Sequence, residues 1–150
     1  MTADESFLRQ ALDLAREAGC AGEIPVGAVV VMDGTIVGRG RNSPIATHDP
    51  TAHAEILALR EAAAVRRNYR LNGATVYTTL EPCVMCAGAL VAARVGRLVF
   101  GARDLRFGGV RSKFALADSM LLNHRLEITE GVCGAECAAL IRSFLESRRD

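Results

Sequence analysis

The chain has 150 residues, of which 50% are hydrophobic and 23% charged, so it suits one packed domain and excludes wholesale disorder. Its 18 basic and 17 acidic residues leave a net charge of +1, which is not typical of a strongly electrostatic nucleic-acid binder. No apolar run approaches the ~18 residues of a membrane span, and no signal peptide is recognisable. We therefore expect a soluble cytoplasmic protein with no membrane partner.

Helix and strand patterns alternate along the chain, which predicts one α/β domain over residues 1–150. Thr2 and Glu5 resemble a capping box, and the apolar stripe that follows predicts a helix ending at Gly19. Residues 26–32 form a continuous apolar run, which is typical of a strand buried on both faces.

The dipeptide Asp33-Gly34 predicts a tight hairpin turn into a strand over residues 35–40. The hairpin pairs its strands antiparallel, whereas the later strand–helix–strand steps favour parallel pairing. The later elements are predicted as a loop over 41–51, helices over 52–66, 83–94, 116–122 and 133–148, and strands over 74–79, 97–101 and 125–130.

Two short motifs carry the chemistry: His53-Ala54-Glu55 and Pro82-Cys83-Val84-Met85-Cys86. Each lies where a loop enters a predicted helix. Cys83 and Cys86 are three residues apart, so both sulfurs face one side of that helix, and a helix N-terminus favours thiolates. Together with His53 they form a ligand set suited to Zn²⁺, with one position left open for water.

Glu55 is the candidate proton shuttle of this site. Two residues in mid-helix are about 200° apart, but at the first turn His53 and Glu55 can still point into one pocket. Zinc lowers the pKa of a bound water, and a carboxylate nearby can take the proton and deliver it to a substrate.

Weaker interpretations exist for each motif taken alone. A single Cys-x-x-Cys also suits a redox dithiol or a structural metal clip, and a single His-x-Glu means little. The five cysteines are an odd number, which argues against a disulfide framework, and we expect Cys20, Cys133 and Cys137 to be buried small hydrophobes. The two motifs together form the known signature of zinc deaminases, so that identification rests on resemblance.

The chain resembles the bacterial tRNA-specific adenosine deaminases, in the cytidine-deaminase-like zinc deaminase superfamily. The resemblance covers about residues 7–149. It is carried by the stretches 22–29, 48–56, 68–71, 79–89, 99–104, 123–125 and 127–131. The stretches Gly-Ala-Arg-Asp at 101–104 and Asn-His-Arg at 123–125 narrow the match toward the tRNA branch.

The resemblance implies a three-layer α/β/α fold with a five-stranded mixed sheet, a homodimer, and one zinc ion per subunit. It implies hydrolytic deamination of the wobble adenosine of an arginine tRNA to inosine, with the anticodon stem-loop as partner. By resemblance, His53, Cys83 and Cys86 bind the zinc and Glu55 is the proton shuttle. A hydrolase of this kind needs no organic cofactor.

Residues implied in substrate binding follow from the same resemblance. Asn42 matches a position that holds the target nucleotide, although an Asn in a loop can instead bond its own backbone in a turn. Val26 and Ala54 match positions that line the base site. The positions that meet the anticodon loop are Asp104, Arg106, Asn123 and Arg149.

The chain departs from the family in two places. Arg106 stands where the family usually has lysine, and Val110-Arg111 replaces a run of small residues. Near the C-terminus, Leu145-Glu146 replaces an aromatic and a basic residue, which weakens base stacking there. Two other functions stay open: a deaminase of a free base or nucleoside such as guanine, cytosine or cytidine, and a non-enzymatic zinc-clipped module in which Glu55 is dispensable.

Overall fold

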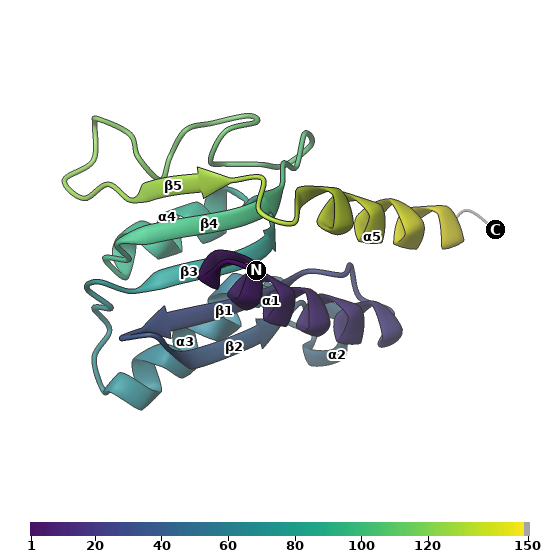
Figure 1. The fold of residues 1–150 in the computed structure, drawn as a ribbon, viewed down its shortest axis with the longest axis horizontal. Coiled ribbons are helices and arrows are strands. Elements are labelled where there is room, and N and C mark those ends of the chain that lie inside the picture. Colours follow the sequence, from purple (N-terminus) through teal and green to yellow (C-terminus); the bar gives the residue numbers. More distant parts are fainter. Residues whose placement is uncertain (149–150) are drawn as a thin grey trace.

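The structure is a computed structural model that describes residues 1–148. Five strands form one mixed sheet in the order β2-β1-β3-β4-β5 (Figure 1). The predicted α/β class and five-stranded mixed sheet are confirmed. The strands are β1 (Gly27–Met32), β2 (Thr35–Arg41), β3 (Thr75–Leu80), β4 (Arg97–Ala102) and β5 (Glu127–Glu130), and the helices are α1 (Ala3–Cys20), α2 (Pro44–Thr47), α3 (Ala54–Arg66), α4 (Val84–Ala92) and α5 (Gly134–Ser147).

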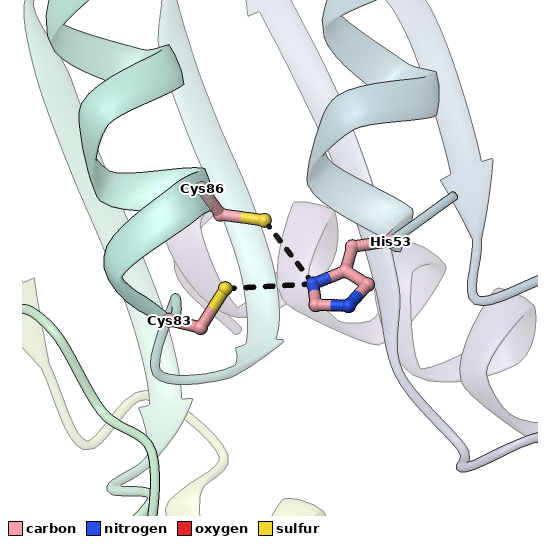
Figure 2. Close-up of side chains that lie close together, drawn as sticks. All are labelled: His53, Cys83 and Cys86. Atoms are coloured by element: carbon pink, nitrogen blue, oxygen red, sulfur yellow. Dashed lines mark hydrogen bonds between the residues drawn. The ribbon is translucent and has the colours of Figure 1, made fainter. Parts of the chain in front are cut away.

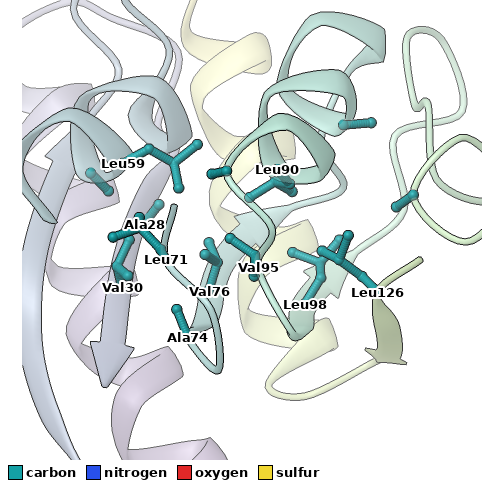
Figure 3. Close-up of a cluster of buried hydrophobic side chains, with 14 of the residues drawn as sticks. Ala28, Val30, Leu59, Leu71, Ala74, Val76, Leu90, Val95, Leu98 and Leu126 are labelled. Carbon is teal, nitrogen blue, oxygen red and sulfur yellow. The ribbon is translucent and has the colours of Figure 1, made fainter. Parts of the chain in front are cut away.

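Helices cover both faces of the sheet and give three layers, with α1 and α5 on one face and α3 and α4 on the other (Figure 1). Because side chains alternate along a strand, β1 contributes to both cores. Ala28 and Val30 pack with α3 and α4 (Figure 3), whereas Val29 and Val31 pack with α1 and α5. This double burial explains the continuous apolar run.

The predicted hairpin turn is confirmed. Asp33 and Gly34 both have positive φ, 52° and 74°, as a type I′ turn requires, and Met32 pairs directly with Thr35. Strand β1 pairs antiparallel with β2 and β3, while β3, β4 and β5 run parallel. The carboxyl ends of β2, β3 and β4 therefore lie at one edge of the sheet.

The helix predicted over residues 116–122 is wrong, because partners seven to nine residues away along the chain hold this segment in another conformation. Leu116 donates its N–H to the Gly109 carbonyl, and the Ala117 carbonyl accepts from Leu126. The carboxylate of Asp118 pairs with the Arg111 guanidinium at 2.9 Å, which holds this segment as an irregular loop.

The short helix α2 lies within the predicted loop and was not expected. It begins at Pro44, whose fixed φ suits a first helical position. The buried carboxylate of Glu23 accepts the N–H groups of Ile45 (3.1 Å) and Ala46 (2.8 Å), so a distant residue stabilises this turn. Four residues alone are too few to form a stable helix.

The three remaining cysteines differ in burial. Cys137 is buried, as predicted, and Cys133 is half-buried. The prediction is wrong for Cys20, which is exposed because it ends α1 and has turned away from the sheet. Within residues 1–148, no helix has the length and apolarity needed to cross a bilayer.

Candidate active site

The polar segments that follow three strands meet at one edge of the sheet. Asn42 follows β2, Glu81 follows β3, and Asp104 lies two residues beyond β4. Ligand sites in open α/β sheets commonly lie at the carboxyl ends of strands. Here they surround a cavity of about 310 Å³, lined by Ile24, Val26, Asn42, His53, Glu55, Glu81, Cys83, Asp104 and Phe107.

Three metal-ligating side chains converge beside this cavity. His53 is the N-cap residue of α3, Cys83 is the N-cap residue of α4, and Cys86 lies in the first turn of α4. Neither N-cap side chain bonds its own helix, so both are free to turn toward each other. The Sγ atoms of Cys83 and Cys86 each lie 3.5 Å from Nδ1 of His53 (Figure 2).

These distances fit a zinc ion. Tetrahedral zinc with its usual Zn–S and Zn–N bond lengths places sulfur and nitrogen ligands about 3.5 Å apart. The three ligand atoms all lie within 4.8 Å of one another. The His53 atom that faces both sulfurs is Nδ1, which spacing in the sequence does not reveal.

The electrostatics of the group favour anionic sulfur. Hydrogen bonds from Cys86 and His53 lower the pKa of the Cys83 thiol to about 4. The pKa of Cys86 is raised because its neighbour Cys83 takes the negative charge first, and the hydrogen bond to Cys83 raises the pKa of His53. A thiolate is the form that binds metal.

Glu55 lies in the first turn of α3 and lines the same cavity as His53. Its side chain is 4% exposed, and burial raises the pKa of its carboxyl to about 7. A pKa near neutrality suits a group that both accepts and donates protons. The first-turn geometry expected for His53 and Glu55 is therefore present.

Close backbone packing allows this placement of α3. Gly40 in β2 lies against the carbonyl of Ala54, and Gly38 lies against that of Ala58. A side chain on either glycine would collide with the helix backbone. Ala54 itself is fully buried in the core, between His53 and Glu55, which both line the cavity.

Asn42 presents a free carboxamide to the cavity. Its backbone N–H donates to the Val26 carbonyl at 3.0 Å, but across residues 1–148 its side chain makes no hydrogen bond. Asn42 is nearly buried, with 9% of its surface exposed, although its carboxamide has no partner in the described residues. The alternative of a turn residue bonded to its own backbone is therefore wrong.

Glu81 lines the cavity and was not predicted as a site residue from the sequence. Its buried carboxylate accepts N–H groups from Asp104 (3.0 Å), Val110 (3.1 Å), Arg111 (2.7 Å) and Ser112 (2.9 Å), and also the Ser112 hydroxyl. Burial raises the pKa of Glu81, but these hydrogen bonds outweigh it and the pKa lies below its ordinary value. The position directly before Pro82-Cys83 was the available signal.

This carboxylate binds the loop after β4 to the start of α4. Gly108 pairs with Cys83, and Gly109 donates its N–H to the Pro82 carbonyl at 2.8 Å. A side chain at Gly108 would collide with the Glu81 carboxylate. Glu81 therefore stabilises the loop and holds it against the segment that carries Cys83 of the metal group.

The residues expected to contact RNA differ in how close they lie to the cavity. Asp104 lines the cavity, and its carboxylate accepts the N–H groups of Arg106 (3.1 Å) and Phe107 (3.2 Å). Arg106 is exposed beside the cavity mouth, whereas Asn123 is exposed on the loop before β5 and does not line the cavity. Arg149 lies outside the described residues.

Comparisons with known proteins agree with this geometry. The family model of the cytidine and deoxycytidylate deaminase zinc-binding region matches residues 1–102. A tRNA-specific adenosine deaminase of Haemophilus influenzae is 51% identical over 98% of this chain and 86% of its own.

Two solved structures extend the comparison. One, from a study of A-to-I editing by tRNA:A34 deaminases at the wobble position of transfer RNA, superposes with a TM-score of 0.87 at 40% identity, over 90% of this chain and 98% of its own. A guanine deaminase from Nitrosomonas europaea superposes with a TM-score of 0.82 at 28% identity, over 93% and 83%. The chain belongs to the zinc-binding cytidine and deoxycytidylate deaminase family and, within it, to the tRNA-specific adenosine deaminases.

Proposed function

We propose that this protein hydrolyses the wobble adenosine of an arginine tRNA to inosine and ammonia, with His53, Cys83 and Cys86 holding one zinc ion per subunit. The observation that carries the proposal is one cavity that unites three elements: the metal group, a buried carboxylate at Glu55 and the free carboxamide of Asn42. The names of the relatives support the tRNA substrate.

The chain's own residues account for the proton movements. When bound, zinc supplies Lewis-acid activation of a water molecule. The Glu55 carboxylate takes one proton from the attacking water and delivers it to N1 of the adenine ring. It then takes the second proton from the new hydroxyl on C6 and delivers it to the amino group, so that the C6–N bond breaks, ammonia leaves and the C6 carbonyl of inosine forms. The carboxamide of Asn42 offers both a donor and an acceptor to orient the nucleotide.

The cavity selects an extruded base. A volume of about 310 Å³ is at the small end of ligand sites and does not admit a stacked anticodon loop. The target adenosine must therefore leave the stack, as enzymes that act on bases require. Val26 lines the wall of this base site, and Asp104 and Arg106 lie at its mouth, where the flanking nucleotides would pass.

A homodimer and a cytoplasmic location complete the proposal. Gly88 and Ala92 expose small surfaces on α4, and an apolar groove between α3 and α4 includes Leu59 and Tyr69. A second copy packed here would cover that groove. Aminoacylated tRNA is used in the cytoplasm, which supports the location. Light scattering should give twice the mass of a 16.0 kDa chain.

A substrate panel tests the proposal against the second candidate, a free-base deaminase, which the similarity to guanine deaminase favours. Zinc-loaded protein is given an arginine tRNA with adenosine at the wobble position, the same tRNA with guanosine there, guanine, cytosine, cytidine and adenosine. We expect inosine from the first tRNA alone. Ammonia released only from a free base or nucleoside would overturn the RNA assignment and keep the deaminase chemistry.

A further inference from the structure

An exposed aromatic ring stands at the mouth of the catalytic cavity. Phe107 lines the cavity together with Asn42 and Glu55, yet its side chain is 65% exposed. Burying an aromatic side chain is strongly favourable, so a ring left in water beside a ligand site marks a contact surface. The interior of the cavity is already lined by groups that suit the target base.

The loop that carries Phe107 is held in place rather than left free. The N–H of Phe107 donates to the Asp104 carboxylate, and the Gly108 N–H donates to the Asp104 carbonyl at 2.9 Å. Glu81 binds the loop on both sides of the ring, through Asp104 and through residues 110–112. A ring held in this way loses little conformational freedom when a ligand contacts it.

The neighbouring charge matches a nucleotide. The guanidinium of Arg106 lies 5.6 Å from the centroid of the Phe107 ring. An aromatic face beside a cation offers a single-stranded nucleotide a surface for its base and a charge for its phosphate. The exposed side chain of Ile24 lines the same cavity, so the rim is apolar as well as basic.

Resting on the proposed function, we infer that Phe107 is a stacking platform for the base next to the extruded adenosine. The target base enters the cavity toward Asn42 and Glu55. The adjacent base of the RNA strand must therefore lie outside the cavity, where the Phe107 ring is exposed. Stacking on the ring replaces the contact that the neighbour loses when the target leaves the stack. Phe107 thus acts in binding and not in proton transfer.

The test compares Phe107→Ala with Phe107→Tyr and with the matched control Phe114→Ala. Phe114 follows on the same loop, is 58% exposed and does not line the cavity. Steady-state inosine formation is measured on an anticodon stem-loop with wobble adenosine. Phe107→Ala should raise KM about 10-fold, while Phe107→Tyr and Phe114→Ala stay within about 2-fold of wild type.

An abasic series identifies the stacked base. Each nucleotide flanking the target is replaced in turn by an abasic residue, and the KM ratio of Phe107→Ala to wild type is measured on each stem-loop. The ratio should fall to about 1 at one flanking position and stay near 10 elsewhere. An unchanged ratio at every position would overturn the inference.

Three further results would also overturn it: equal KM for Phe107→Ala and wild type, an equal loss in Phe114→Ala, or a changed oligomeric mass of Phe107→Ala in light scattering. The last would assign the ring to a contact between copies of the chain. If wild type forms no inosine at all, the proposed tRNA deamination is wrong. If wild type forms inosine and Phe107→Ala has the same KM, only the stacking role of Phe107 is wrong.

Discussion

The catalytic centre and the loop between β4 and β5 are built in different ways. His53, Glu55, Cys83 and Cys86 come from two short motifs, each placed by the first turn of a helix. The loop over residues 103–126 has no helix or strand of its own and depends on distant partners such as Glu81. The metal-ligating group is thus encoded locally, whereas the loop that contributes Asp104 and Phe107 to the cavity depends on long-range contacts.

Removing a metal ligand should have the largest effect. Cys83→Ser replaces a thiolate by a hydroxyl, so zinc per chain should fall at least about 10-fold and inosine formation with it. Metal analysis by mass spectrometry and the inosine assay measure both. The exposed Cys20 supplies the control, since Cys20→Ser should keep one zinc per chain. Full zinc in Cys83→Ser would show that the ligand set is wrong.

Glu55→Gln should separate proton transfer from metal binding within the same centre. The substitution keeps the shape of the side chain but removes the group that accepts a proton, so kcat should fall about 10³-fold. Zinc content should stay near that of wild type because Glu55 is not in the metal group. Full turnover would exclude Glu55 as the proton shuttle.

Glu81→Gln should damage the loop and spare the metal group. Every partner of the Glu81 carboxylate is a hydrogen-bond donor. A carboxamide replaces one accepting oxygen by an NH₂ donor, which faces N–H groups and cannot bond them. We expect a loss of about 2 kcal/mol in the free energy of unfolding, a Tm lower by about 6 °C, and a higher KM for the stem-loop.

Denaturant unfolding measures the free energy, thermal melting the Tm and steady-state kinetics the KM, while zinc analysis checks that the metal group is kept. The matched control is Glu127→Gln on β5, where the carboxylate is exposed. If Glu81→Gln lost zinc as readily as Cys83→Ser, zinc binding would depend on the loop, and the metal group would not be encoded independently of it.

Asp4 supplies the smallest predicted effect and lies on the other face of the sheet. Its carboxylate accepts from the Arg97 guanidinium at 2.7 Å and from the Tyr77 hydroxyl at 2.7 Å, and the Arg97 hydrogen bond lowers its pKa below the ordinary 3.8. The stabilisation is therefore present above pH 3.8 and is lost as the pH falls through the lowered value.

For Asp4→Asn we expect a Tm about 3 °C lower at pH 7, corresponding to about 1 kcal/mol. The difference from wild type should shrink once the pH is well below 3.8 and the Asp4 carboxyl takes up its proton, and turnover at pH 7 should be unchanged. A Tm difference that persists in acid would show that the ion pair is not its source.

Much of the fold was predictable because it follows from local patterns. The apolar run in β1, the Asp33-Gly34 turn and the motifs at the starts of α3 and α4 each act over a few residues. The short helix α2 and the segment over 116–122 were not predictable. Their conformations depend on contacts with Glu23, Gly109 and Arg111, which lie outside these segments.

The candidate site divides in the same way. The metal group and Glu55 were predicted from two short motifs whose joint meaning rests on the resemblance to zinc deaminases, but the position of Nδ1 of His53 against both sulfurs depends on how two helices meet. The only signal for Glu81 is its position directly before Pro82-Cys83, and its hydrogen bonds exist only once the loop after β4 folds back onto it.

A zinc titration tests whether deamination depends on the zinc that His53, Cys83 and Cys86 are proposed to hold. Metal-stripped protein is loaded stepwise with zinc, and zinc per chain and inosine in an arginine tRNA with wobble adenosine are measured in the same samples. Inosine formation should rise in proportion to zinc and level off at one ion per chain. Inosine formed without zinc, or full zinc loading without inosine, would show that this protein is not a zinc-dependent deaminase of that tRNA.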